Sequence, residues 1–216
     1  MLKLNSFERS FGMVTRFWGK KIGMAQVFVE DSVVPVTVID TGRWYVTQVK
    51  TQKQDGYDAV QVGLVKEKFA NTVFSNQWLK KSKNYFQVLR EIRLQAPCES
   101  KVGDRADYYQ HLNSGDTVDV FGITKGAGFA GCVRRHGFSG SSATHGAMMG
   151  NRPGSLGFMR SRGRVIKGKK LPGHMGVNRR MAAGLEVVRV EPDSQVIVVK
   201  GSVPGKSGSL LFIRKA

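Results

Sequence analysis

The sequence predicts a mainly β fold with a small α+β insertion and a long, irregular basic loop. Runs of β-branched residues recur between residues 25 and 65 and again near the C-terminus, with Gly and Asp between them. In the intervening part, residues 120–185 contain no Asp or Glu. These observations predict an antiparallel sheet or barrel from which this acid-free stretch, residues 120–185, extends.

Four strands are predicted in the N-terminal part of the chain. Val and other β-branched or apolar residues recur in each run, and polar turn residues separate one run from the next. Pro35 has no backbone N–H, so it predicts an edge position or a bulge in its strand. The four runs are residues 25–29, 33–39, 45–50 and 59–65.

The segment 66–110 differs from its surroundings, because aromatic residues become frequent and a lysine-rich patch appears. We expect an inserted α+β piece with a helix over 74–80 and a strand over 85–94. Aromatic side chains beside lysines can stack on bases, but large aromatic side chains usually pack inside a small domain. Packing is the favoured interpretation.

Two predicted strands frame the acid-free stretch, because 117–124 leads directly into it and 185–190 follows it. Two further strands, 195–200 and 209–214, are predicted after it. The acid-free stretch is therefore a loop that leaves a β-domain and returns to it, rather than a tail.

The acid-free stretch carries twelve of the 34 cations, three of the four histidines and fifteen of the 26 glycines. The other 150 residues hold 22 cations and 16 acids, a net of +6 out of +18 for the whole chain. Such a charge favours an anionic partner, most often nucleic acid. The apolar residues of the stretch are isolated, so it should be disordered alone and order on a polyanion. A flexible basic linker is the alternative, but Phe, Met, His and Pro recur at irregular places, as specific contacts require.

Membrane and disulfide-rich proteins fit the sequence poorly. No run of about 18 apolar residues and no sustained amphipathic helix favours a membrane partner. Cys98 and Cys132 form no CxxC motif, so a disulfide framework and a four-cysteine zinc site are excluded. Reduced cytosolic thiols are the favoured interpretation.

The segment GSVPGKS (201–207) resembles a phosphate-binding loop, but three residues separate its glycines where that motif needs four. A predicted strand also follows it instead of a helix. His136, His145 and His174 have no acid within the stretch to orient them, and adding Cys132 gives no recognised zinc spacing. The sequence therefore predicts no enzyme, no metal, no cofactor and no small-molecule substrate.

A series of segments carries a more specific signal: GKKIGMAQVF (19–28), VPVTVI (34–39), VTQVK (46–50), DGYDAVQVG (55–63), ITKGAGFAGCVRRHGF (123–138), ATHGAMMGNRPGSLG (143–157), GKKLPGHMG (168–176), and LEVVRV with VKGSVPGKSGS near the C-terminus. In this order they resemble the bacterial-type family of ribosomal protein L three, the third protein of the large ribosomal subunit. The similarity runs from about Met13 to the C-terminus.

This resemblance implies a six-stranded β-barrel of the translation-protein kind, with the loop reaching toward the peptidyl-transferase region. It also implies a structural constituent of the large subunit that binds 23S-type rRNA early in assembly, beside neighbouring ribosomal proteins, and that is not a catalyst. We expect it on ribosomes of the bacterial cytoplasm; an organellar ribosome is disfavoured because no clear presequence precedes Met13. The expected parts are a disordered extension at 1–12, a barrel of 13–65, 111–120 and 184–216, an α+β insertion at 66–110, and a basic extension at 121–183. A free RNA- or DNA-binding regulator is the alternative function, but no recognition-helix signal favours it.

The inward tip of the loop corresponds to RPGSLG (152–157) and the residues just after it. Arg160 stands where some family members carry a methylated glutamine, so that modification should be absent. Arg162 stands where proline is common, which makes the tip more basic.

The expected rRNA-binding residues are mainly the cations and histidines of the basic extension. Most should contact phosphates. A subset should also stack on or hydrogen-bond to unpaired bases, namely His145, Arg152, Phe158 and Arg160. The full set is Lys20, Lys21, Lys125, Arg134, Arg135, His136, His145, Arg152, Phe158, Arg160, Arg162, Arg164, Lys167, Lys169, Lys170, His174, Arg179 and Arg180.

Overall fold

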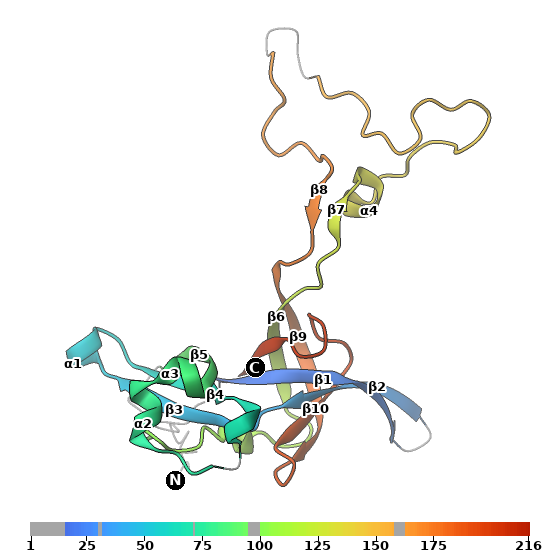
Figure 1. Cartoon of the computed structure of the whole chain (residues 1–216). Coiled ribbons are helices and arrows are strands. Elements are labelled where there is room, and N and C mark those ends of the chain that lie inside the picture. Colours follow the sequence, from blue (N-terminus) through green and yellow to red (C-terminus); the bar gives the residue numbers. More distant parts are fainter. Residues whose placement is uncertain (1–15, 30–31, 71, 95–99, 158–162) are drawn as a thin grey trace, which may run out of the picture. The chain divides into compact units, whose positions relative to one another are not determined.

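The chain forms two compact units, residues up to Gly122 together with Arg180–Ala216, and Ile123–Arg179. The computed structural model describes residues 16–29, 32–70, 72–94, 100–157 and 163–216, so the predicted extension 1–12 lies outside it. Strands predominate over helices along the described chain, which confirms the prediction of a mainly β protein (Figure 1).

Six strands of the first unit close into a barrel. They are β1 (Arg16–Val29), β2 (Ser32–Asp40), β6 (Thr117–Ile123), β9 (Arg179–Glu191), β10 (Val196–Lys200) and β11 (Leu210–Lys215). Their order around the barrel is β1, β11, β6, β9, β10, β2. The pairs β1·β11, β11·β6, β9·β10, β10·β2 and β2·β1 are all antiparallel. Closure removes the exposed sheet edges that invite aggregation.

The barrel strands fold this way because apolar residues alternate along them and fill one common interior. In β11, Leu211 and Ile213 are fully buried, whereas the residues between and beside them are half-buried. The same alternation begins in β1 at Phe17, eight residues before the sequence pattern suggested a strand. The Gly-Lys-Lys run conceals it, because a glycine and a lysine occupy inward positions there.

Two predicted strands belong to a different sheet from the one expected. The segments 45–50 and 59–65 were expected in the barrel, but they form β3 (Trp44–Lys50) and β4 (Ala59–Val65) of a separate three-stranded sheet. Its third strand is β5 (Phe86–Arg93), which comes from the predicted insertion. Strand partners are chosen by packing between distant segments, and a local pattern does not specify that choice.

The remaining helices of the first unit are short. They are α1 (Gln52–Asp55), η1 (Glu67–Phe69), α2 (Asn76–Lys80), α3 (Ser82–Tyr85) and η2 (Tyr108–His111). Aromatic side chains of the insertion pack on one another, with the rings of Trp78 and Tyr85 stacked at 5.3 Å and Phe69 and Tyr85 at 4.8 Å. Trp78 is buried, so the packing interpretation of these aromatic residues holds for it.

The second unit contains three short elements, β7 (Gly128–Ala130), α4 (Cys132–His136) and β8 (Gly173–Met175) (Figure 1). Strands β7 and β8 pair antiparallel, and the residues between α4 and β8 that are described lack regular structure. Among the described residues of this unit, only Ala130 and Cys132 are buried. The unit therefore has no apolar core of its own comparable to that of the barrel.

Candidate nucleic-acid interface

The basic unit, residues 123–179, is held together at its base by a small stem. Strands β7 and β8 pair across it, and the amide of Thr124 donates to the carbonyl of Asn178. Helix α4 begins two residues after β7 and turns its side chains onto the returning chain. Arg135 Nη1 donates to the carbonyl oxygen of Leu171 at 2.8 Å, and His136 Nε2 lies 2.9 Å from the same oxygen.

Cys132 completes the stem, because its buried thiol lies 3.7 Å from the carbonyl of Lys170. Two glycines allow the segments to approach this closely. A Cβ on Gly173 would lie 2.5 Å from Arg135 Nη1, and a Cβ on Gly176 would overlap the carbonyl of Lys125. Gly176 also has a φ of +85°, which side chains rarely adopt. The stem is therefore a specific structure rather than a chance crossing of a linker.

Most of the predicted contact residues in this part of the chain point their side chains to solvent. The acid-free sequence gives these cations no carboxylate partner within their own unit. Their charges are thus available to an outside anion, and the unit has a field of a single sign. The exposed members of the predicted set are Lys125, Arg134, His145, Arg152, Arg164, Lys167, Lys170, His174, Arg179 and Arg180.

Several predicted contact residues lie elsewhere or have other partners. Arg135 and His136 are half-buried and bonded to the stem, as described above, and Lys20 and Lys169 are half-buried. Phe158, Arg160 and Arg162 lie outside the described residues, and so does the comparison of the tip with its relatives.

Lys21 requires a correction. Its side chain is 7% exposed, and its Nζ donates to the carbonyls of Val203 at 3.0 Å and Gly205 at 3.2 Å. The loop that resembles a phosphate-binding motif therefore presents carbonyl oxygens to a lysine, and β11 rather than a helix follows it. Lys20 and Lys21 are neighbours on one strand, so only one of them can face outward. We assign Lys21 a structural role.

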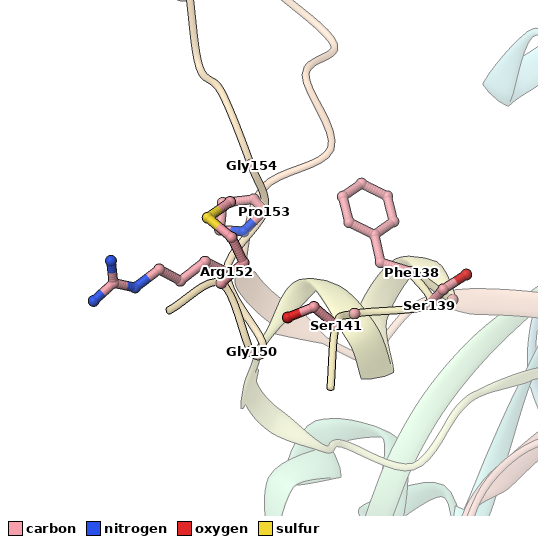
Figure 2. Close-up of a pocket in the computed structure, with 10 residues that line it drawn as sticks. Phe138, Ser139, Ser141, Gly150, Arg152, Pro153 and Gly154 are labelled. Carbon is pink, nitrogen blue, oxygen red and sulfur yellow. The ribbon is translucent and has the colours of Figure 1, made fainter. Parts of the chain in front are cut away.

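Two open depressions meet at Phe138 and Pro153, both of which line each of them. One is lined by 137–141 and 149–154 with the exception of Asn151, and the other by 166–170. Figure 2 shows the first, with the ring of Phe138 standing to one side and the guanidinium of Arg152 pointing away from it. The arrangement places an aromatic surface between cationic side chains.

Phe129 and Phe138 are contact candidates that sequence reasoning missed. Phe129 is 79% exposed and lies directly opposite His174 in the β7·β8 ribbon, so both side chains share one face. An exposed aromatic residue in a glycine-rich basic stretch was the available signal. Its isolation from other apolar residues made it look like a residue without a role.

The anchor of the basic unit in the barrel is Asp119, the last acid before the acid-free stretch. Its carboxylate accepts from the amide of Gly184 on β9 at 3.0 Å and from Arg214 Nη2 on β11 at 2.5 Å. Arg214 and then the Gly184 amide hold the pKa of Asp119 below its usual range. One carboxylate thus ties together the three strands from which the chain leaves and to which it returns.

Metal-ligating and membrane-spanning features were also sought. Within the described ranges, no group of three or more His, Cys, Asp or Glu residues is placed to hold a metal ion. No helix in the described part of the chain is both long and apolar enough to cross a membrane.

Comparison with known proteins gives the family. A sequence profile described as "Ribosomal protein L3" matches residues 95–195. The large ribosomal subunit protein uL3 of Desulforapulum autotrophicum is 43% identical over 201 residues, which cover 92% of this chain and 97% of that protein. The corresponding values are 41% over 208 residues, 94% and 98% for uL3 of Syntrophobacter fumaroxidans, and 42% over 200 residues, 92% and 95% for uL3 of Thermotoga petrophila. With similarity of this extent, the chain belongs to the uL3 family of large ribosomal subunit proteins.

Proposed function

We propose that this protein is a structural constituent of the large ribosomal subunit that binds 23S-type rRNA through its basic extension, residues 121–183. The observation that carries the proposal is the single-sign charge of the unit 123–179, whose eleven cations have no acid beside them in the sequence. Such a unit gains free energy only when an outside polyanion neutralises it. The family relationship supports rRNA as that polyanion.

The mechanism is architectural. Where rRNA helices crowd together, their phosphates repel, and the exposed Lys and Arg side chains of the extension offset that repulsion. Each phosphate contact releases condensed counterions, so binding should weaken steeply as salt rises. The stem of β7, α4 and β8 holds the two ends of the extension together, so it enters the RNA as a pinned loop. Pinning the ends lowers the entropy lost on ordering.

Base contacts would supply the fit that phosphates do not. The exposed pair Phe129 and His174 offers a flat surface on which an unpaired base can stack, and Phe138 offers another beside the 166–170 segment. Arg152 can hydrogen-bond to or stack on a base as well as bind phosphate. Double-stranded RNA is recognised by shape and 2′-OH groups, so specificity comes from the fit of the whole extension to one folded RNA.

We assign the other parts by the same argument. The six-stranded barrel, which we propose is of the translation-protein kind, acts with the three-stranded sheet as the anchor at the subunit surface. The extension reaches inward toward the peptidyl-transferase region and supports early assembly beside neighbouring ribosomal proteins. The protein has a structural role without catalysis and resides on ribosomes in the bacterial cytoplasm.

Sedimentation of ribosomes through a series of salt concentrations tests this proposal. The chain, followed by quantitative mass spectrometry, should stay at one copy per large subunit through washes that remove loosely bound basic proteins. A variant in which residues 133–179 are replaced by a short Gly-Ser linker should be absent from mature subunits. Release of the unaltered chain into the soluble fraction at moderate salt would contradict the proposal and favour a free RNA-binding regulator.

A further inference from the structure

The distal part of the β1–β2 hairpin is a second exposed surface, with chemistry opposite to that of the basic unit. Strand β1 pairs with β11 through Lys20, and β2 pairs with β10 from Val36 onward. Between these points and the turn, residues 24–29 and 32–35 pair with each other, and no third strand is paired with them among the described residues. Figure 1 shows this two-stranded ribbon in blue at the β1 and β2 labels.

One face of this ribbon is apolar and open. Phe28 lies opposite Val33, and these side chains are 78% and 50% exposed. Met24, four residues before Phe28 on the same strand, shares their face and is 52% exposed. A two-stranded hairpin is marginally stable alone in water, and exposed apolar groups clustered on one face mark an interaction site. We call Met24, Phe28 and Val33 the hairpin face.

The charge around the hairpin face excludes rRNA phosphate as its natural partner. Residues 22–42 form the longest stretch of the chain without Lys or Arg, 21 residues in a protein with 34 cations. The acids of this stretch are Glu30, Asp31 and Asp40. Without cations the segment releases no counterions from RNA, and its own negative charges are repelled by phosphates. A protein surface that is apolar at its centre and basic around it has the complementary properties.

From these observations we propose that the hairpin face docks on a basic protein of the same subunit, which covers Met24, Phe28 and Val33 with an apolar patch. Phe28 is the anchor, since a large aromatic side chain at the centre of an interface contributes most to binding. The inference rests on the proposed function in one respect, because it places the partner in the large subunit. It divides the molecule's contacts by chemistry: the basic unit binds RNA and the hairpin binds protein.

Site-specific photocrosslinking in assembled large subunits tests this inference. A photoreactive p-benzoylphenylalanine replaces Phe28 in one strain, Arg152 in a second and Val73 in a third. Val73 is the matched control, because it is 90% exposed in the first unit but lies outside the hairpin. We expect position 28 to crosslink to one Lys- and Arg-rich protein, position 152 to crosslink to rRNA, and position 73 not to give the adduct found at position 28.

The outcomes separate the two proposals. Adducts of position 28 with rRNA, with an acidic protein or with a second copy of this chain would overturn the hairpin inference, as would no adduct at all. Absence of rRNA adducts at position 152 would count against the proposed function while leaving a protein adduct at position 28 intact. Raising the salt before irradiation should lower the rRNA yield at position 152 and leave the yield at position 28 unchanged, since apolar contacts are not screened.

A loss-of-contact variant gives a second measurement. The double variant F28S/V33S should bind the crosslinked partner, once purified, about tenfold or more weakly than the unaltered chain does. The control V73S should bind as the unaltered chain does. Circular dichroism and urea unfolding establish that both variants fold. Equal binding by F28S/V33S and the unaltered chain would refute the docking of this face.

Discussion

The barrel unit and the basic unit illustrate two ways in which a chain acquires a fixed shape. The barrel unit buries an apolar core and pairs its charges internally, as Arg214 does with Asp119 and Lys50 with Glu91. The basic unit has two buried residues among those described and no carboxylate of its own. The first unit can be stable in water, whereas the second needs an external polyanion to pay its ordering entropy. Local sequence composition decides which of the two applies.

Removing the basic unit is the most direct way to break this comparison. Replacing residues 133–179 by a short Gly-Ser linker takes away ten cations. We expect the barrel to remain folded, and affinity for large-subunit rRNA to fall by about a thousandfold or more at fixed moderate salt, since six to ten phosphate contacts carry an effect of that size. Urea unfolding and filter binding measure the two properties. A barrel that unfolds on removal of the loop would show that the units are not independent.

Truncating one side chain in each unit sharpens the contrast. Leu211 is fully buried in β11, and Leu211→Ala should lower the free energy of unfolding by about 2–5 kcal/mol. Phe129 is 79% exposed, and Phe129→Ala should change stability by less than about 0.5 kcal/mol. The same Phe129 variant should nevertheless weaken rRNA binding, which Leu211→Ala affects only through folding. Urea titrations and binding curves on both variants provide the comparison; unaffected binding by Phe129→Ala would remove it from the interface.

Two lysine triplets allow a test of equal charge in different surroundings. Lys167, Lys169 and Lys170 belong to the basic unit, and their replacement by Gln should reduce the slope of log K against log salt by about 2 and weaken binding on the order of tenfold to a hundredfold. The matched control replaces three lysines of the insertion, which are also exposed, by Gln: Lys80, Lys81 and Lys83. The control should change the slope less. Equal slopes for both triplets would mean that total charge, rather than its location, governs binding.

The smallest expected effect concerns Asp119, where the two units share a chain crossing. Because its folded-state pKa is lowered, the ionised carboxylate stabilises the fold above its unfolded-state pKa, and this stabilisation is lost as pH falls through the folded-state pKa. Asp119→Asn should cost about 1–2 kcal/mol at neutral pH and progressively less in acid. Urea unfolding as a function of pH measures this. Asp193→Asn, at an exposed turn acid, is the control, and a pH-independent loss in Asp119→Asn would exclude the electrostatic explanation.

The sequence was sufficient for the parts of this structure that depend on local composition. The strands 117–124 and 195–200 and the acid-free stretch between sheet segments could be predicted, because alternation and charge are local signals. The sheet to which 45–50 and 59–65 belong could not, because β5 supplies their partner from a segment beyond them. Lys21 shows the corresponding limit for the site. Charge suggested an RNA contact, but strand alternation and the bulge between Lys21 and Gly23 turn the side chain inward.

Pairing of β1 with β11 has a consequence for the order of synthesis. These strands lie near opposite ends of the described chain, so β1 lacks a barrel neighbour until residues 210–215 have been translated. The acid-free stretch is made well before that moment, and its cations reach the surrounding solution while the barrel is still open. Long-range pairing of this kind also closes slowly. The nascent chain therefore presents a polycation to cellular RNA before its own anchor exists, and the time between these events is when a wrong RNA partner could be captured.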